Sequence, residues 1–155
     1  MQTTDSEPEL THLYRKEGAR LWRAVFAYCG DREIANDAVA EAFAQYARRG
    51  ELVRKPAAWI WRAAFKIAGG ELQRRSRHTP MPTQLAYEVV DRVPVTEALA
   101  RLSSRQRATI VLHYYAGYSA AEIAQILAIN PATVRVHMLQ ARRKLSSLLK
   151  EEDDV

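Results

Sequence analysis

The chain has 155 residues, of which 26% are charged and 48% hydrophobic, with 23 Lys and Arg against 18 Asp and Glu. This length allows one ordinary domain or two small ones, and it excludes large multidomain machinery. No apolar stretch approaches the roughly 20 residues that a membrane-spanning helix needs, so we expect no membrane insertion. The single cysteine, Cys29, cannot close a disulfide within the chain, which predicts a reducing, cytoplasmic setting.

The first half of the chain has apolar residues at helical spacing. Helices are predicted at about 10–29, 31–50 and 56–77. Gly30 ends the first helix, Asp31 is placed to cap the second, and Pro56 suits the first position of the third. Residues 1–9 are expected to be a disordered N-terminus, which leaves a helical domain over 10–77.

The second half predicts another helical unit, separated from the first by a proline-containing linker. The linker spans 78–94 and contains Pro80, Pro82 and Pro94. Helices are predicted near 95–102, 104–116, 119–127 and 131–149, within a domain over 95–150 that precedes an acidic tail at 151–155. Neither half shows the alternation of a β-strand, so the predicted fold class is all-α, with two small helical domains.

A helix-turn-helix is predicted within the second unit. Ser119 and Glu122 have the spacing of a capping box, in which each side chain binds the backbone amide of the other residue. Asn130 and Pro131 supply a second helix start only three residues after Leu127. A short helix followed at once by a longer one is the arrangement with which many proteins enter the DNA major groove.

The last predicted helix has an apolar side and a basic side. Residues that must face the core are Val134, Met138, Ala141 and Leu145. The opposite arc and its flanks predict DNA contacts from Thr133, Arg135, Val136, His137, Gln140, Arg143 and Lys144. Gln can read adenine, Arg can read guanine, and Val can pack on a thymine methyl group. A hairpin with a solvated basic face is the alternative, but exposed Val136 and Leu139 argue against it.

Positive charge is concentrated in two blocks. The segments Arg54–Arg77 and Arg105–Lys150 each hold seven Lys or Arg and one Glu, which predicts a polyanion bound at two places. In the first block, regularly spaced cations can follow a phosphate backbone while aromatic rings stack on unpaired bases. For Trp59 and Trp61 themselves, a core position is the favoured interpretation.

Three acidic residues form a stripe on the second predicted helix. Glu33, Asp37 and Glu41 follow one another at intervals of four, opposite a core side that includes Val39 and Tyr46. Like charges at that spacing cost a few tenths of a kcal/mol per pair. A basic external partner would explain the stripe, and a solvated helix face explains it equally well.

The sequence contains no motif that predicts an enzyme. The four histidines are scattered, and none lies at a metal-ligand spacing from cysteines or acids, so neither a metal site nor a cofactor is expected. No phosphate-binding glycine loop or nucleophile elbow is present, and no catalytic residue is predicted. Cys29 is interpreted as a small buried residue.

Several stretches resemble bacterial RNA polymerase sigma factors of the extracytoplasmic-function type, within the sigma-70 family. They are Asp37-Ala38-Val39-Ala40-Glu41-Ala42-Phe43, Ala58-Trp59-Ile60-Trp61-Arg62-Ala63-Ala64, Leu102-Ser103-Ser104-Arg105-Gln106-Arg107, Ser119 to Ala124, and Thr133-Val134-Arg135. The resemblance covers roughly residues 10–150, with two matching units in the expected order.

The resemblance implies that region 2, at 10–77, binds the clamp helices of core RNA polymerase and melts the minus-10 promoter element. Region 4, at 95–150, would bind the polymerase flap and read the minus-35 element, and an anti-sigma factor would be a further partner. The residues implied for polymerase binding are Asp37, Glu41 and Phe43. Those implied for the melted minus-10 DNA are Arg48, Arg54, Lys55, Arg62, Lys66, Arg74 and Arg77.

Two alternative functions stay open at this point. A plain helix-turn-helix transcriptional regulator would explain the second unit but leave the first one unexplained. A sigma-like decoy would bind polymerase or an anti-sigma protein without melting DNA. Lys66 and Gly70, where the resembling family often has Asn and Asp, would be the signature of such a decoy.

Overall fold

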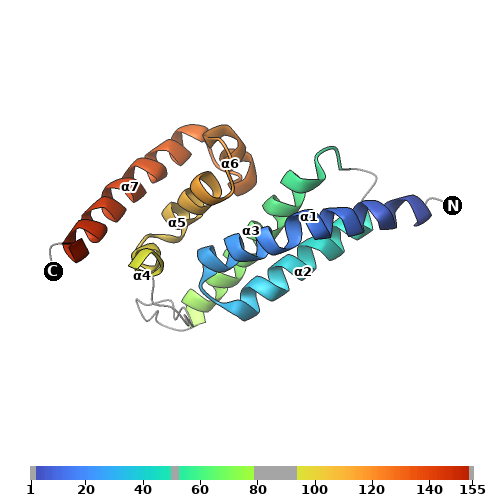
Figure 1. Ribbon diagram of the computed structural model, residues 1–155, viewed down its shortest axis with the longest axis horizontal. Coiled ribbons are helices and arrows are strands. Elements are labelled where there is room, and N and C mark those ends of the chain that lie inside the picture. Colours follow the sequence, from blue (N-terminus) through green and yellow to red (C-terminus); the bar gives the residue numbers. More distant parts are fainter. Residues whose placement is uncertain (1–2, 50–52, 79–93, 154–155) are drawn as a thin grey trace.

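The computed structural model describes the chain over residues 3–49, 53–78 and 94–153, and every regular element there is helical. The elements are α1 (Thr3–Cys29), α2 (Arg32–Arg49), α3 (Pro56–His78), α4 (Pro94–Ala100), α5 (Ser104–Ile110), the π-helical turn η2 (Val111–Tyr115), α6 (Ala120–Leu127) and α7 (Pro131–Asp153). Helices α1 to α3 pack into one bundle and α4 to α7 into a second (Figure 1). The all-α fold class is confirmed.

Local chemistry sets the helix boundaries where the sequence predicted them. Gly30 ends α1 with a φ of 69°, a conformation that glycine adopts without a steric penalty. The Asp31 carboxylate accepts a hydrogen bond from the backbone amide of Ile34 at 3.1 Å, and so caps α2. Pro56 is the first residue of α3, where its missing amide hydrogen leaves no bond unmade.

Several helices differ from their predicted extents. Helix α7 continues to Asp153 rather than ending near 149, so part of the predicted acidic tail is helical. Helix α1 begins at Thr3, so most of the segment 1–9 is helical rather than disordered; the segment carries acidic and hydroxyl residues, which the positive end of a helix dipole favours. The predicted helix 104–116 divides into α5 and the wider turn η2, in which the Ala116 amide donates to the Val111 carbonyl at 3.1 Å. Most of the predicted linker, residues 79–93, lies outside the described residues.

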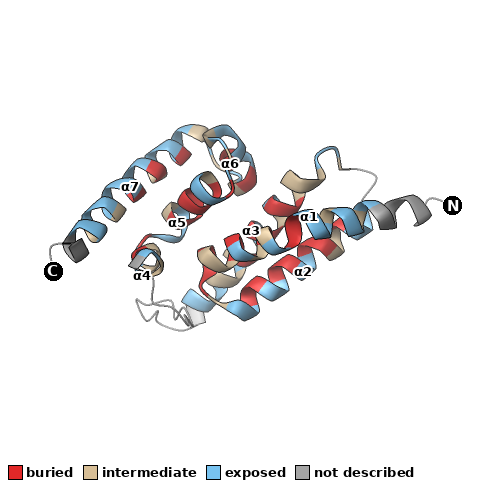
Figure 2. Cartoon of the chain, in the orientation of Figure 1, coloured by how far each residue is buried: buried red, intermediate tan, exposed pale blue. Residues whose placement is uncertain are grey.

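The first bundle closes around large side chains of α1 and α3. Leu21, Ile60 and Trp61 are fully buried, and Phe65 is 2% exposed. The indole nitrogen of Trp61 donates to the Glu17 carboxylate at 3.1 Å, which satisfies a polar group that burial would otherwise leave unpaired. The core interpretation of Trp61 is therefore confirmed. Figure 2 shows the buried faces of the three helices turned toward one another.

The two bundles are docked on each other by a reciprocal pair of arginines. Arg107 of α5 is 4% exposed, and its Nε donates to the carbonyl of Tyr28 at the end of α1, at 2.5 Å. In the opposite direction, Arg20 of α1 donates to the carbonyl of Ala116, just after η2. Each cation therefore meets the carbonyl-rich, partially negative end of a helix in the other bundle.

Aromatic packing closes the same junction. The ring of Tyr118 lies edge-on to that of Trp61, with centroids 5.5 Å apart, and the Arg20 guanidinium lies 5.3 Å from the Trp61 ring centre. Helix α3 also packs along α6. The result is a closed arrangement in which α7 lies on the far side of the second bundle from α3 (Figure 1).

Candidate nucleic-acid interface

The helix-turn-helix is built by three local devices. Ser119 and Glu122 form the predicted capping box, and the hydrogen bonds that Glu122 receives from Ser119 lower the pKa of its carboxyl. Helix α6 ends at Ala128, which is left-handed with a φ of 56°. The side-chain oxygen of Asn130 then accepts from the Ala132 amide at 2.8 Å, and Pro131 begins α7. The turn thus occupies only residues 128–130 between the two helices.

The two sides of α7 are those the sequence predicted. Val134 and Ala141 are fully buried, Met138 is 6% exposed, and Leu145 packs against the core. On the other side, Val136 and Leu139 are 52% and 48% exposed. Exposure of two large apolar side chains on a basic helix is unfavourable in water alone and favours a contact surface. Figure 2 shows this outer side of α7 as largely exposed.

Most residues predicted to bind upstream DNA share this exposed side. The exposed ones are Thr133, Arg135, Val136, Gln140, Arg143 and Lys144. His137 departs from the prediction, because it is only partly exposed and its Nδ1 atom is buried without a hydrogen-bond partner among the described residues. Because His137 lies at the edge of the buried side of α7, part of its ring is buried, and only the rest of the side chain is accessible to DNA.

Two supporting side chains were not predicted from the sequence. The Gln106 amide nitrogen of α5 donates to the side-chain oxygen of Gln140 at 3.3 Å, which orients one of the candidate base-reading groups. Arg142 donates to the Tyr114 hydroxyl at 2.5 Å, and its guanidinium lies 5.4 Å from the Tyr114 ring centre. Tyr114 belongs to the π-helical turn, which no sequence pattern indicated.

The cations of the first bundle fall into two groups. Arg62 and Lys66 of α3 are exposed and have no ion-pair partner among the described residues. Arg48 pairs with Glu41 at 3.1 Å and Arg74 with Glu71 at 3.3 Å. Exposed pairs of this kind are weak and exchange readily with phosphate. Arg54 and Lys55 are exposed in the segment before α3, and the Arg77 side chain lies outside the described residues.

A hollow between α2 and α3 gathers most of these cations around an aromatic ring. It has a volume of about 690 Å³ and is lined by Gln45, Arg48, Arg49, Trp59, Arg62, Ala63, Lys66, Ile67, Gly70 and Arg74. Trp59 is half-buried there and lies 6.1 Å from the ring of Tyr46. Cations beside a partly exposed indole can hold the backbone of an unpaired strand while a base stacks on the ring.

The acidic stripe on α2 differs in one respect from its prediction. Asp37 is exposed and has no hydrogen-bond or ion-pair partner among the described residues, whereas Glu41 accepts hydrogen bonds from Gln45 and Arg48, both at 3.1 Å. Those bonds hold the pKa of the Glu41 carboxyl below its usual range. Glu41 therefore has partners on its own helix, whereas both explanations offered for the stripe considered only an external partner or solvent.

Phe43 is also not a surface residue. It is 7% exposed and lies edge-on to Tyr14, with ring centroids 5.1 Å apart. Helical geometry explains this, because Phe43 shares the side of α2 that carries Val39 and Tyr46. Phe43 therefore belongs to the core. A partner bound to the outer side of α2 would contact Asp37 and Glu41 instead.

No cluster of three or more His, Cys, Asp or Glu suited to a metal ion occurs within the described residues. In the same part of the chain, no helix combines the length and the apolar character that a membrane span requires. Cys29 is fully buried, and burial raises the pKa of its thiol to about 11.

Comparison with known proteins relates both bundles to one family. The family model for sigma-70 region 4 matches residues 92–145. The ECF RNA polymerase sigma factor SigM of Mycobacterium tuberculosis is 31% identical over 88% of this chain and 75% of its own length. SigL of the same species, also an ECF RNA polymerase sigma factor, is 29% identical over 90% of this chain and 88% of its own.

Solved structures share the fold at lower identity. The sigma factor RpoE of Bartonella quintana, in complex with the anti-sigma factor NepR, matches with a TM-score of 0.74 and 20% identity over 94% of this chain and 97% of its own. CnrH, in complex with the cytosolic domain of CnrY, matches with a TM-score of 0.73 and 22% identity over 96% of this chain and 92% of its own.

Proposed function

The chain belongs to the ECF RNA polymerase sigma factors, and we propose on that basis that it binds core RNA polymerase and directs transcription initiation at a subset of promoters. The observation that carries this proposal is the relationship to SigM across 88% of the chain, which includes both helical bundles. Initiation is a binding and strand-opening function, and we assign no catalytic residue and no cofactor to it. Its place of action is the cytoplasm, where polymerase and chromosome lie.

We assign region 2 to residues 10–77 and region 4 to residues 95–150. In region 4, the exposed side of α7 reads the minus-35 element, with Arg135, Gln140 and Arg143 in position to reach base edges. In region 2, the hollow beside Trp59 holds the melted minus-10 strand, with Arg62 and Lys66 on its phosphates. The acidic side of α2 binds a basic surface of the polymerase.

An anti-sigma factor is the proposed regulatory partner. One structural neighbour was solved with the anti-sigma factor NepR and another with the cytosolic domain of CnrY. The closed arrangement here leaves the acidic side of α2 and the outer side of α7 accessible to a partner. Of the two alternatives, the plain helix-turn-helix regulator does not account for the first bundle, which the related sigma factors also contain. The decoy makes a different prediction for transcription.

Reconstitution with bacterial core polymerase tests the proposal. Run-off transcription on fragmented genomic DNA of the source organism should yield discrete transcripts that depend on the chain. Asp37→Lys, which breaks no side-chain bond within the described residues, should reduce polymerase binding and transcripts about tenfold or more, as expected when a charge in a complementary interface is reversed. Glu97→Lys in α4 makes the same charge change at an exposed site outside the stripe and should leave both unchanged.

The other outcomes separate the alternatives. Stable polymerase binding without any transcript would replace the proposal with the decoy. Specific DNA binding with no polymerase binding would replace it with the helix-turn-helix regulator.

A further inference from the structure

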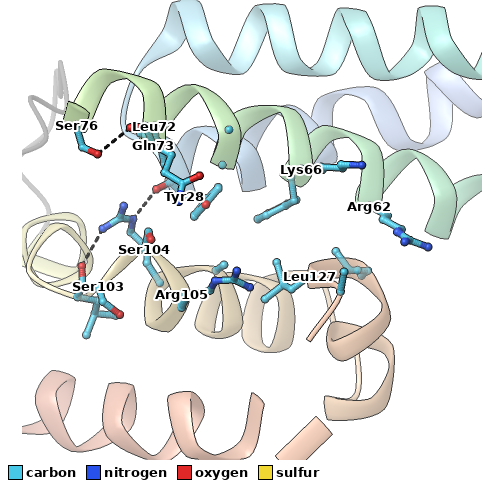
Figure 3. Close-up of a pocket in the computed structure, with 18 of the residues that line it drawn as sticks. Tyr28, Arg62, Lys66, Leu72, Gln73, Ser76, Ser103, Ser104, Arg105 and Leu127 are labelled. Atoms are coloured by element: carbon cyan, nitrogen blue, oxygen red, sulfur yellow. Dashed lines mark hydrogen bonds between the residues drawn. The ribbon is translucent and has the colours of Figure 1, made fainter. Parts of the chain in front are cut away.

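A second hollow lies between the two bundles and does not belong to either unit alone. It has a volume of about 760 Å³, within the range of about 300–1,000 Å³ for small-ligand sites. One wall is α3, and the other is formed by the start of α5 and the end of α6. Figure 3 shows Arg62 and Lys66 on the α3 wall and Ser103, Ser104, Arg105 and Leu127 on the wall opposite.

The charge in this hollow has one sign. Its lining includes Arg62, Lys66, Arg105 and Arg107, and no Asp or Glu among the described residues lines it. At the floor of this hollow, Arg107 already donates hydrogen bonds to backbone carbonyls, including that of Leu102 at 3.0 Å. Arg62, Lys66 and Arg105 are exposed and have no ion-pair partner in the described part of the chain. Like charges facing each other across a hollow focus a positive potential that favours an anion.

This hollow adjoins the one assigned to the minus-10 strand across a ridge of α3. Both are lined by Arg62, Lys66 and Gly70. A side chain at Gly70 would meet nothing within 4 Å, so the ridge between the hollows is open there. The described lining of the hollow between α2 and α3 likewise contains no carboxylate. Together they form a basic track, which we define as running from Trp59 over Arg62 and Lys66 to Arg105.

We propose that the closed chain, without polymerase, binds single-stranded nucleic acid along this track, with Arg105 of the second bundle as an additional phosphate contact. A polymer fits better than a mononucleotide because the cations are spread over two adjoining hollows. Unpaired nucleotides fit better than a duplex because each hollow has only the volume of a small-ligand site. The half-buried Trp59 ring offers a stacking surface at one end of the track.

The proposal has a conformational consequence. A strand that touches Arg62 on one bundle and Arg105 on the other binds the closed arrangement better than an open one, so it stabilises closure. The inference rests on the proposed function for the part of the track that region 2 supplies. The part supplied by Arg105 is independent, because no promoter or polymerase contact is assigned to that residue.

Fluorescence anisotropy of the full-length chain with a labelled 12-nucleotide single strand tests the proposal. The variants are Arg105→Glu and, as a matched control, Arg101→Glu, an exposed arginine four residues earlier that lines neither hollow. Arg105→Glu should weaken binding several-fold and make the slope of log affinity against log salt shallower by about 0.7, the value for one phosphate contact on a single strand. Arg101→Glu should change neither quantity.

Several outcomes would overturn the inference. They are an equal effect of both variants, equal competition by a duplex of the same sequence, and displacement of the strand by ATP or by an acidic peptide at the same concentration as an unlabelled strand. The run-off assay separates this failure from that of the proposed function. Normal transcription with no Arg105 effect rejects only the strand track, whereas Arg105-dependent strand binding without transcription rejects only the sigma factor proposal.

Discussion

At the scale of single residues, Cys29 makes the free energy of unfolding depend on pH in the alkaline range. Burial raises the pKa of its thiol from 9.0 to about 11. Between these values the folded chain keeps a proton that the unfolded chain has lost, so the free energy of unfolding falls as pH rises from about 9 toward 11. Below pH 9 both states are protonated and the contribution is constant.

Cys29→Ala should remove that dependence. Urea unfolding of the variant between pH 8.5 and 10.5 should show a shallower loss of stability than the natural chain, by at most about 1.4 kcal/mol per pH unit. Burial also raises the pKa of Tyr118, to about 12, but Tyr118 is common to both proteins and cancels in the comparison. Identical pH profiles would show that the thiol titrates alike in the folded and unfolded chains.

Single residues also mark where sequence reasoning about the site reached its limit. Helical spacing placed Val134, Met138 and Ala141 in the core correctly, because that periodicity depends only on local geometry. Helical spacing could not show that the Nδ1 atom of His137 is buried, since the orientation of a ring at the edge of a buried side depends on the neighbouring side chains. Nor could it show that Arg48 forms an ion pair with Glu41, seven residues earlier in the sequence.

At the scale of elements, the helix-turn-helix carries a residue that is poorly suited to its conformation. Ala128 ends α6 in the left-handed region, with φ and ψ of 56° and 46°. That conformation costs an L-residue roughly 1–2 kcal/mol, and glycine avoids the cost. The usual sequence signal for the turn, a glycine, is therefore absent, and the motif was recognised from the capping residues on either side.

Ala128→Gly should stabilise the protein by up to about 1 kcal/mol, because the relief of strain exceeds the extra unfolded-state entropy of glycine. Urea unfolding followed by circular dichroism measures this as a higher midpoint. Ala121→Gly, at an exposed helical position of the same α6, should lower the midpoint instead. A lower midpoint for both variants would mean that the left-handed turn is not strained.

At the scale of the whole molecule, the sequence predicted two helical units but not their docking. The number and order of helices follow from local periodicity and caps. The junction depends on Arg107 reaching the carbonyl of Tyr28, 79 residues away, and on Arg20 reaching that of Ala116, 96 residues away. An arginine within a basic block is predicted to contact phosphate. The residues next to Arg107 in the sequence do not indicate that it is instead buried against helix ends.

The docking gives Arg107 a role that its removal should reveal. Arg107→Met keeps an unbranched side chain but deletes the guanidinium that bonds to carbonyls of both bundles. Loss of a buried charged donor leaves those acceptors unsatisfied, at a cost of about 2–4 kcal/mol. The bond to the Tyr28 carbonyl is the one that joins the two bundles, so its loss weakens the closed arrangement. We therefore expect the bundles to separate while each remains helical.

Small-angle scattering should then show a larger radius of gyration for Arg107→Met at an unchanged helix content by circular dichroism. Arg101→Met, which removes an exposed arginine of the same unit, should leave the scattering curve unchanged. A radius of gyration equal to that of the natural chain would show that the Trp61–Tyr118 contact and the Arg20 bond hold the bundles together without Arg107. Loss of helix content would instead place Arg107 in the core of region 4, because its bonds to the carbonyls of Leu99 and Leu102 lie within that unit.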